Sequence, residues 1–233
     1  MKTTYYQDGL ATVHNADFRQ EPRFAQAYKQ GFDLGGWGPN GPNVWRVYVV
    51  CWAAFVASRL EGDFVECGVD KGSMARAVIE YVNFPSLNKR FVLMDTFEGL
   101  VEELITDAER QLWAGKHTHL QPGAYPPSYD RVVNTFAPYG DRVQIIRGAI
   151  PSTLDQVTTD RVAFMSIDMN CVAPEIAAIE FFWPRLTKGA IVVLDDYAWP
   201  GHIEQKKAHD AFARKHNTIV LSLPTGQGVL IKH

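Results

Sequence analysis

The sequence has few of the features that would place it in a specialised class of proteins. It contains three cysteines in 233 residues, Cys51, Cys67 and Cys171, which are too few for a disulfide framework and are not spaced as a Cys-x-x-Cys zinc pair. This cysteine content favours free thiols in a reducing compartment, and we therefore expect a cytoplasmic protein. The charges nearly balance, with 23 Lys and Arg against 26 Asp and Glu, so no basic surface is expected for nucleic acid.

Long hydrophobic runs are also missing. Polar residues follow Met1 where the apolar core of a signal peptide would stand. The longest apolar stretch, residues 44–60, carries Arg46 and Arg59 and is shorter than the roughly 20 residues of a membrane span. We expect a buried helix there and no membrane partner. An apolar fraction of 46% is enough for a large folded core, which excludes a disordered or collagen-like chain.

From residue 63 onward, short apolar segments alternate with helical patterns. Expected strands are residues 64–69, 90–95, 143–146, 162–168 and 190–195, and expected helices are residues 72–83, 128–139, 174–186 and 202–216. Such alternation requires crossover connections, and hence a mostly parallel sheet whose strands are buried on both faces. Two last strands, residues 218–223 and 228–232, are joined by a short turn and must be antiparallel. The pattern predicts an α/β fold with a doubly wound, seven-stranded sheet that ends in an antiparallel strand.

Two segments lie outside this alternation. Residues 1–62 are expected to form a loop and a helical cap on a domain of residues 63–233, with a Gly- and Pro-rich loop at residues 31–42. Residues 97–127 are inserted between the second strand and its helix, and insertions of this length in compact domains are often lids. The insertion contains Trp113, His117 and His119. Without a third ligand in view, the two histidines are more typical of a loop than of a metal site.

Glycines and an acidic residue stand where the first two strands end, the edge at which open α/β sheets bind ligands. Gly68 and Gly72 follow the first strand and allow a ligand to approach the backbone closely. Asp95 ends the second strand, where a carboxylate can bind both hydroxyls of a ribose. The spacing Gly-x-x-x-Gly lacks the middle glycine of the dinucleotide fingerprint, which favours a nucleoside without pyrophosphate, such as S-adenosylmethionine. An ordinary turn at the glycines and a turn-forming role for Asp95 are the alternatives.

Three more acids stand where the fourth and fifth strands end. Asp168 ends the fourth strand, and Asp195 and Asp196 end the fifth. Because one helix links these strands, we expect them to be neighbours, and like charges this close repel unless a cation compensates. Carboxylate oxygens suit Mg²⁺ or Mn²⁺. A capping role for Asp195 and Asp196, with a solvated Asp168, is the alternative.

Five motifs occur in an order that resembles the macrocin O-methyltransferase family. They are ECGVDKGS at residues 66–73, DTFEGL at 95–100, RGAIPSTL at 147–154, Ile167-Asp168, and LDDY at 194–197. The resemblance covers about residues 36–232 and implies a class I, S-adenosylmethionine-dependent and metal-dependent methyltransferase. Members of that family methylate sugar hydroxyls in natural products and related glycosides. Two departures are Asn170, where a second acid is usual, and Asp70-Lys71, where Trp-Arg is frequent.

The resemblance also implies a role for individual residues. Glu66, Gly68, Gly72 and Ser73 would contact the methionine half of the cofactor, Asp95 the ribose with Thr96 beside it, Gly148 and Ala149 the adenine, and Asp168, Asp195 and Asp196 the metal ion.

The predicted chemistry is attack of an alcohol oxygen on the methyl group of a sulfonium. Asp168 is the first candidate for the base that removes the proton, and His202 is the second. A histidine at this position is more often exposed to solvent at the start of a helix. The expected partner is a sugar or glycoside acceptor, and a homodimer or higher oligomer is open. Three rivals remain: a nicotinamide-dependent oxidoreductase, a non-catalytic scaffold, and a methyltransferase for a non-sugar alcohol or phenol.

Overall fold

The computed structural model describes residues 2–35, 37, 43–114 and 124–233 and is built around one seven-stranded sheet. Its strands are β3 (Asp63–Cys67), β4 (Phe91–Asp95), β5 (Val143–Arg147), β6 (Val162–Ile167), β7 (Leu186–Leu194), β8 (Leu221–Ser222) and β9 (Gly228–Ile231). The order across the sheet is β5-β4-β3-β6-β7-β9-β8, and only β9 runs antiparallel to its neighbours. The predicted doubly wound, mostly parallel sheet with a closing antiparallel hairpin is therefore confirmed.

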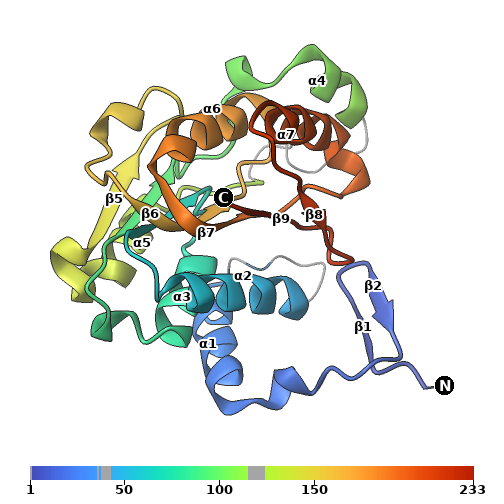
Figure 1. The fold of residues 1–233 in the computed structure, drawn as a ribbon, viewed down its shortest axis with the longest axis vertical. Coiled ribbons are helices and arrows are strands. Elements are labelled where there is room, and N and C mark those ends of the chain that lie inside the picture. The colour runs from blue at the N-terminus through green and yellow to red at the C-terminus, as the bar shows by residue number, and fades with distance from the viewer. Residues whose placement is uncertain (1, 36, 38–42, 115–123) are drawn as a thin grey trace.

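Helices cover both faces of this sheet (Figure 1). On one face lie α2 (Val44–Ala57), α3 (Ser73–Tyr81) and α5 (Tyr129–Phe136), with α1 (Pro22–Phe32) outside them against α3. The other face carries α6 (Val172–Phe182) and α7 (Ile203–Lys215), and α4 (Asp107–Trp113) lies beyond them. The strand order reverses between β3 and β6, so the edge expected to bind ligands is at their carboxyl ends.

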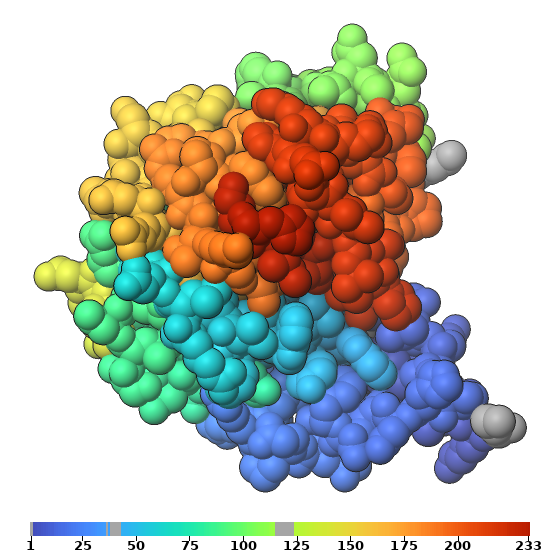
Figure 2. Space-filling view, viewed as in Figure 1, coloured from blue at the N-terminus to red at the C-terminus, as the bar shows by residue number. Residues whose placement is uncertain are grey.

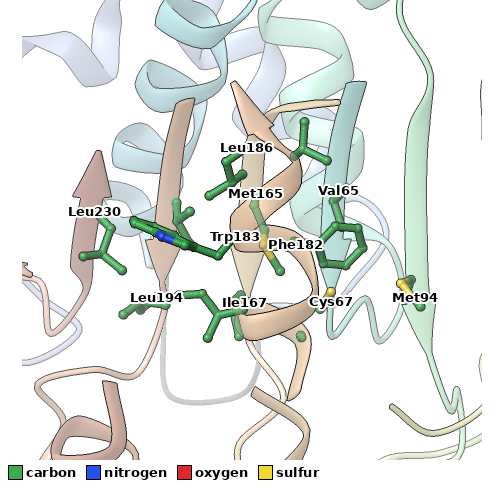
Figure 3. Packing of buried hydrophobic residues seen from close by; sticks show 14 of the residues in the cluster. Val65, Cys67, Met94, Met165, Ile167, Phe182, Trp183, Leu186, Leu194 and Leu230 are labelled. Atoms are coloured by element: carbon green, nitrogen blue, oxygen red, sulfur yellow. The ribbon is translucent and has the colours of Figure 1, made fainter. Parts of the chain in front are cut away.

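The strands are buried on both faces because their side chains alternate between two cores. Phe64 of β3 packs toward α2 and α3, whereas Val65 and Cys67 pack toward α6 and α7. Figure 3 shows the second of these cores, where Phe182 and Trp183 lie over side chains from the neighbouring strands. This two-sided packing holds the strand ends rigidly and so fixes the positions of the residues that follow them.

The N-terminal segment is more regular than its sequence suggests. It forms a small hairpin from β1 (Tyr5–Gln7) and β2 (Leu10–Thr12), which the sequence analysis missed, and then α1, which includes the first two residues of the expected 31–42 loop. In Figure 2 this segment (blue) lies at the lower right, beside the C-terminal segment (red). Asp8, in the hairpin turn, reaches Arg46 of α2, so the hairpin is tied to the sheet edge. The division between residues 1–62 and 63–233 stays a prediction.

Other differences from the expected elements are shifts of their ends. The helix expected at residues 174–186 begins at Val172 and ends at Phe182, because Trp183–Arg185 turns into a 3-10 helix and β7 already begins at Leu186. The inserted segment contains α4, whose N-cap Thr106 forms a capping box with Glu109. No helix in the described parts of the chain is long and apolar enough to cross a membrane.

Candidate active site

The loop after β3 needs glycine at both predicted positions. Gly68 has φ +92°, and a Cβ there would lie 1.8 Å from the backbone oxygen of Asp168. Gly72 has φ +82° at the N-cap of α3, and a Cβ would lie 2.6 Å from the Phe136 ring. A side chain at either position would push the ends of β3 and β6 apart or displace α5. The two glycines thus let the loop lie flat against the sheet edge.

Asp95 holds this loop in place. Its Oδ2 accepts hydrogen bonds from the backbone N–H groups of Val69 (2.5 Å) and Asp70 (2.9 Å). Its Oδ1 accepts from the N–H of Phe97 at 2.6 Å, and Thr96 stabilises the following turn by donating its hydroxyl to the Gly99 oxygen. The turn-forming alternative for Asp95 is therefore present, and its contact with a ribose stays a prediction.

The loops after β4 and β5 meet beside this carboxylate. The Gly148 N–H donates to the backbone oxygen of Asp95 at 2.8 Å, and Ala149 follows at the same edge, where its own oxygen accepts from the Thr153 hydroxyl. Gly148 has φ +136°. The structure thus brings the residues predicted for the ribose and the adenine together, and we call the loops after β3, β4 and β5 the glycine-loop region.

Glu66, near the end of β3, also belongs to this region, and its carboxyl has no cation beside it among the described residues. Its side chain is 1% exposed, and neither carboxyl oxygen has a hydrogen bond of ordinary geometry with the described residues. Burial raises its pKa well above the usual range; the Ala75 N–H at the start of α3 opposes this, while Asp95 and Asp195 add to it. Ser73, also buried, begins the same helix. A buried acid of this kind is suited to a ligand that brings a positive charge.

The three acids predicted on the other side of the edge come together. β6 pairs with β7 up to Ile167 and Leu194, and the Asp195 N–H donates to the Ile167 oxygen, so Asp168 stands beside Asp195. Burial raises the pKa of Asp168 well above its usual range, and the charges of Asp195 and Asp196 raise it further. We call Asp168, Asp195 and Asp196 the acid cluster.

Arg46 of α2 supplies a cation to the acid cluster from within the chain. Its Nη1 lies 2.5 Å from Oδ2 of Asp195 and 3.3 Å from Oδ1 of Asp196, while its Nε lies 2.9 Å from Oδ2 of Asp8. Burial would lower the pKa of Arg46, but the charges of Asp195, Asp196, Asp8 and Asp168 outweigh burial and raise it, so the guanidinium stays charged. Gln227 of the last hairpin donates to the remaining oxygen of Asp195 at 2.9 Å.

This arrangement does not form a metal-binding group as the side chains lie. Both oxygens of Asp195 are occupied by Arg46 and Gln227, and Oδ1 of Asp168 accepts from Asn170 at 3.3 Å. Across residues 2–35, 37, 43–114 and 124–233, no three His, Cys, Asp or Glu side chains are grouped so that they could hold a metal ion. Binding of Mg²⁺ or Mn²⁺ stays a prediction.

His202 lies at the acid cluster, buried to 5% exposure rather than exposed at the start of a helix. Its Nε2 is 3.7 Å from Oδ2 of Asp196, and its Nδ1 is in hydrogen-bond contact with Oε1 of Gln205. Trp113 of α4 packs against the imidazole with ring centroids 5.8 Å apart and donates its Nε1–H to the Gly201 oxygen at 2.8 Å. Trp113, from the inserted segment, therefore reaches the site. His117 and His119 lie outside the described residues.

Several residues of the site gave no signal in the sequence. In the sequence, Arg46 was notable only as a charge that argues against a membrane span. Asp8 and Gln227 come from segments far apart in the chain. Tyr125 lies near Asp168 and Asp196, whose charges add to burial in raising the pKa of its phenol. The polar residues of α6 and α7 behind His202 were likewise missed. A pattern of alternating charge and apolar residues could not have found them, because each reaches the site through tertiary contacts.

A family model for macrocin-O-methyltransferase matches residues 45–222 of the chain. The chain belongs to the macrocin O-methyltransferase family. It is therefore an S-adenosylmethionine-dependent methyltransferase, as the five motifs predicted, and the nicotinamide-dependent alternative is set aside.

Two curated relatives support this assignment. The methyltransferase is 28% identical over 193 residues to the 8-demethyl-8-(2,3-dimethoxy-alpha-L-rhamnosyl)-tetracenomycin-C 4'-O-methyltransferase of Streptomyces olivaceus, covering 78% of this chain and 70% of the relative. It is 25% identical over 158 residues to the mycinamicin III 3''-O-methyltransferase of Micromonospora griseorubida, covering 64% of this chain and 61% of the relative.

Solved structures share the fold. The O-methyltransferase NovP superposes with a TM-score of 0.69 at 18% identity, over 94% of this chain and 90% of that chain. The calicheamicin methyltransferase CalS11 superposes with a TM-score of 0.61 at 19% identity, over 94% of each chain. At this level of identity the likeness concerns the sheet and its helices, which are those of class I methyltransferases.

Proposed function

We propose that this methyltransferase transfers a methyl group from S-adenosylmethionine to a hydroxyl of a sugar, free or within a glycoside. The observation that carries the proposal is the buried carboxyl of Glu66 in the glycine-loop region, which has no cation beside it among the described residues, at the same sheet edge as the acid cluster. The names of the curated relatives support a sugar acceptor, since one acts on a rhamnosyl group and both are O-methyltransferases.

The glycine-loop region fits the cofactor in three respects. The ammonium of the methionine half would neutralise Glu66, which is the kind of cation that this buried acid lacks. Gly68 and Gly72 leave the backbone bare where the ligand must approach. Asp95 and the backbone of Gly148 and Ala149 stand where a ribose and an adenine would follow, so that the nucleoside lies across the ends of β3, β4 and β5.

The acid cluster fits the acceptor side of the reaction. When bound, the cofactor supplies a sulfonium methyl group, which passes to the acceptor oxygen as the carbon–sulfur bond breaks and its electron pair stays on sulfur. The chain must align the hydroxyl and take its proton. Asp168 is the first candidate for that base, because it follows β6 beside Gly68, at the edge where the cofactor and the acceptor must meet. His202 at Asp196 is the second candidate.

Two further parts of the prediction are finer than the family assignment. We propose that Mg²⁺ or Mn²⁺ joins the acid cluster, where it would compete with Arg46 and Gln227 for the oxygens of Asp195. The argument for an added cation is charge, since four carboxylates, those of Asp8, Asp168, Asp195 and Asp196, share the single charge of Arg46. We also propose a cytoplasmic protein, in keeping with three buried, free cysteines.

Methyl transfer to a defined panel of acceptors tests this function. The panel contains a nucleotide-linked rhamnose, a rhamnosyl glycoside and, as phenol control, catechol, each incubated with S-adenosylmethionine labelled in the methyl group. We expect label in the sugars and none in catechol. Calorimetry should show binding of S-adenosylmethionine and none of NAD⁺. Label in catechol alone would overturn the sugar acceptor, and failure to bind S-adenosylmethionine would overturn the whole proposal.

A further inference from the structure

A row of four buried polar side chains runs from the acid cluster into the contact between α6 and α7. It consists of His202, Gln205, Glu175 and His209, which are between 1% and 5% exposed. The core side of this contact is otherwise lined by apolar side chains such as Ala178, Ile179 and Phe212. Because buried polar groups are costly unless each finds a partner, such a row calls for an explanation.

The directions of the hydrogen bonds in the row follow from Glu175. Its Oε1 accepts from the Met169 N–H (3.1 Å) and from Nε2 of Gln205 (2.8 Å), and its Oε2 lies 2.9 Å from Nε2 of His209. Because Oε1 of Glu175 accepts in both of these bonds, Gln205 turns its amide NH₂ toward Glu175. Its Oε1 is then the atom that faces Nδ1 of His202.

An amide oxygen can only accept, so the proton of a neutral His202 must be on Nδ1. The lone pair of Nε2 then points toward Asp196, 3.7 Å away, at the edge where the acceptor hydroxyl must lie. Trp113 packs against the same ring and limits its rotation. The row therefore determines both the tautomer and the orientation of the imidazole.

We propose that Gln205 and Glu175 are positioning residues that hold His202 in the tautomer with the proton on Nδ1, so that Nε2 accepts a hydrogen bond from the acceptor hydroxyl. The contact between Nε2 and an acceptor hydroxyl rests on the proposed function, whereas the hydrogen bonds that orient His202 do not. His209 completes the row from the far side by donating to Glu175, which keeps that carboxylate in place; its own Nδ1 is buried with no partner in the described part of the chain.

Nitrogen NMR of histidine-labelled, ligand-free protein tests the tautomer without any substrate. The His202 signals are assigned by their loss in His202→Asn. We expect one neutral tautomer, with a proton on Nδ1 and none on Nε2. A protonated Nε2 in the wild-type protein would overturn the proposal. Since no methyl transfer is measured, this result is independent of whether the proposed function is correct.

Two variants at Gln205 separate positioning from mere packing. Gln205→Met keeps the volume but removes both hydrogen bonds, and we expect mixed tautomers with kcat about tenfold lower, the effect of losing one ordinary hydrogen bond. The affinity for S-adenosylmethionine should not change, because Gln205 lies outside the glycine-loop region. Gln205→Glu, protonated so that it donates to Glu175 and accepts from Nδ1, should restore the single tautomer and most of kcat.

The matched control is Lys215→Met on the outer face of the same helix, where Lys215 pairs with Glu180. It should change neither the tautomer nor kcat. A Gln205→Met protein that binds the cofactor normally and keeps both the wild-type tautomer and kcat would show that the row only fills space between α6 and α7.

Discussion

The glycine-loop region and the acid cluster share one sheet edge but balance their charges in opposite ways. In the glycine-loop region, both carboxylate oxygens of Asp95 accept hydrogen bonds from backbone N–H groups. The buried carboxyl of Glu66 has no hydrogen bond of ordinary geometry with the described residues. In the acid cluster, Asp195 is paired on both oxygens, by Arg46 and by Gln227. One region is short of a cation, and the other has its own.

Because of this difference, we expect the stability of the two regions to respond differently to ligand binding. A buried acid without a partner costs stability until a cation arrives, so the glycine-loop region should gain most when the cofactor binds. The acid cluster is already held by Arg46 and should change little. Substitutions in each region test this contrast.

Loss of the candidate base should affect turnover and leave the other region intact. Asp168→Asn keeps the shape of the side chain but cannot take the proton, and we expect kcat to fall about 10²- to 10⁴-fold. Cofactor affinity, measured by calorimetry, should stay near the wild-type value. Asp160→Asn, an exposed change on the loop before β6, is the control. A variant with wild-type kcat would transfer the role of base to another group.

Removal of the internal cation should be the most damaging change for stability. Arg46→Met leaves Asp8, Asp195 and Asp196 buried without their partner, and breaking a buried pair in this way costs about 3 kcal/mol of unfolding free energy. Urea unfolding measures the loss, with the exposed Arg59→Met just after the same helix as control. Equal stability of the two variants would show that Arg46 does not neutralise the acids.

The same variant sharpens the question of the metal ion. Without the competing guanidinium, the acid cluster should bind Mg²⁺ more tightly in Arg46→Met than in the wild-type protein, as calorimetry can measure. Chelation of the wild-type protein with EDTA is the companion experiment. Loss of methyl transfer, restored by Mg²⁺ or Mn²⁺, would support the predicted metal, whereas full activity after chelation would leave Arg46 as the cation that the reaction uses.

Glu66 should be costly to the empty protein and valuable to the complex. Glu66→Gln removes the charge that meets the cofactor ammonium, and we expect affinity for S-adenosylmethionine to fall by about 2 kcal/mol. Because burial raises the folded pKa above the unfolded value, the ligand-free fold binds more protons, and its stability should fall as pH rises above the unfolded value. Urea unfolding between pH 5 and pH 8 should show a shallower fall in Glu66→Gln than in wild type or in the exposed Glu61→Gln.

The smallest effect is expected at Asp95. Asp95→Asn keeps one oxygen for the loop and loses a charged acceptor, so cofactor affinity should weaken by about 1 kcal/mol while kcat holds. Asp155→Asn, exposed on the segment after β5, is the control. A loss of kcat without any loss of cofactor affinity would remove Asp95 from the nucleoside site.

The sequence predicted residues that directly follow a strand, but not residues that reach the site through long-range contacts. The parallel sheet, Gly68, Asp95 and the three acids were predictable because each motif directly follows its strand, and strand ends share an edge. Arg46 and Gln227 were not, since nothing local in an apolar helix or a hairpin turn indicates a partner 149 or 32 residues away. The hairpin at residues 5–12 was missed for a similar reason, as its stability depends on contacts with distant elements such as Trp45 and Arg46.

The contacts around Arg46 also decide when the site can exist during synthesis. Asp8 binds Arg46, Arg46 binds Asp195, and Gln227, 181 residues after Arg46, bonds to both Asp195 and the backbone of Arg46. The residues that set the glycine-loop region lie between positions 66 and 149 and leave the ribosome well before then. The nascent chain can therefore prepare a place for the cofactor early, but it cannot complete the acid cluster until the hairpin that carries Gln227 has left the ribosome.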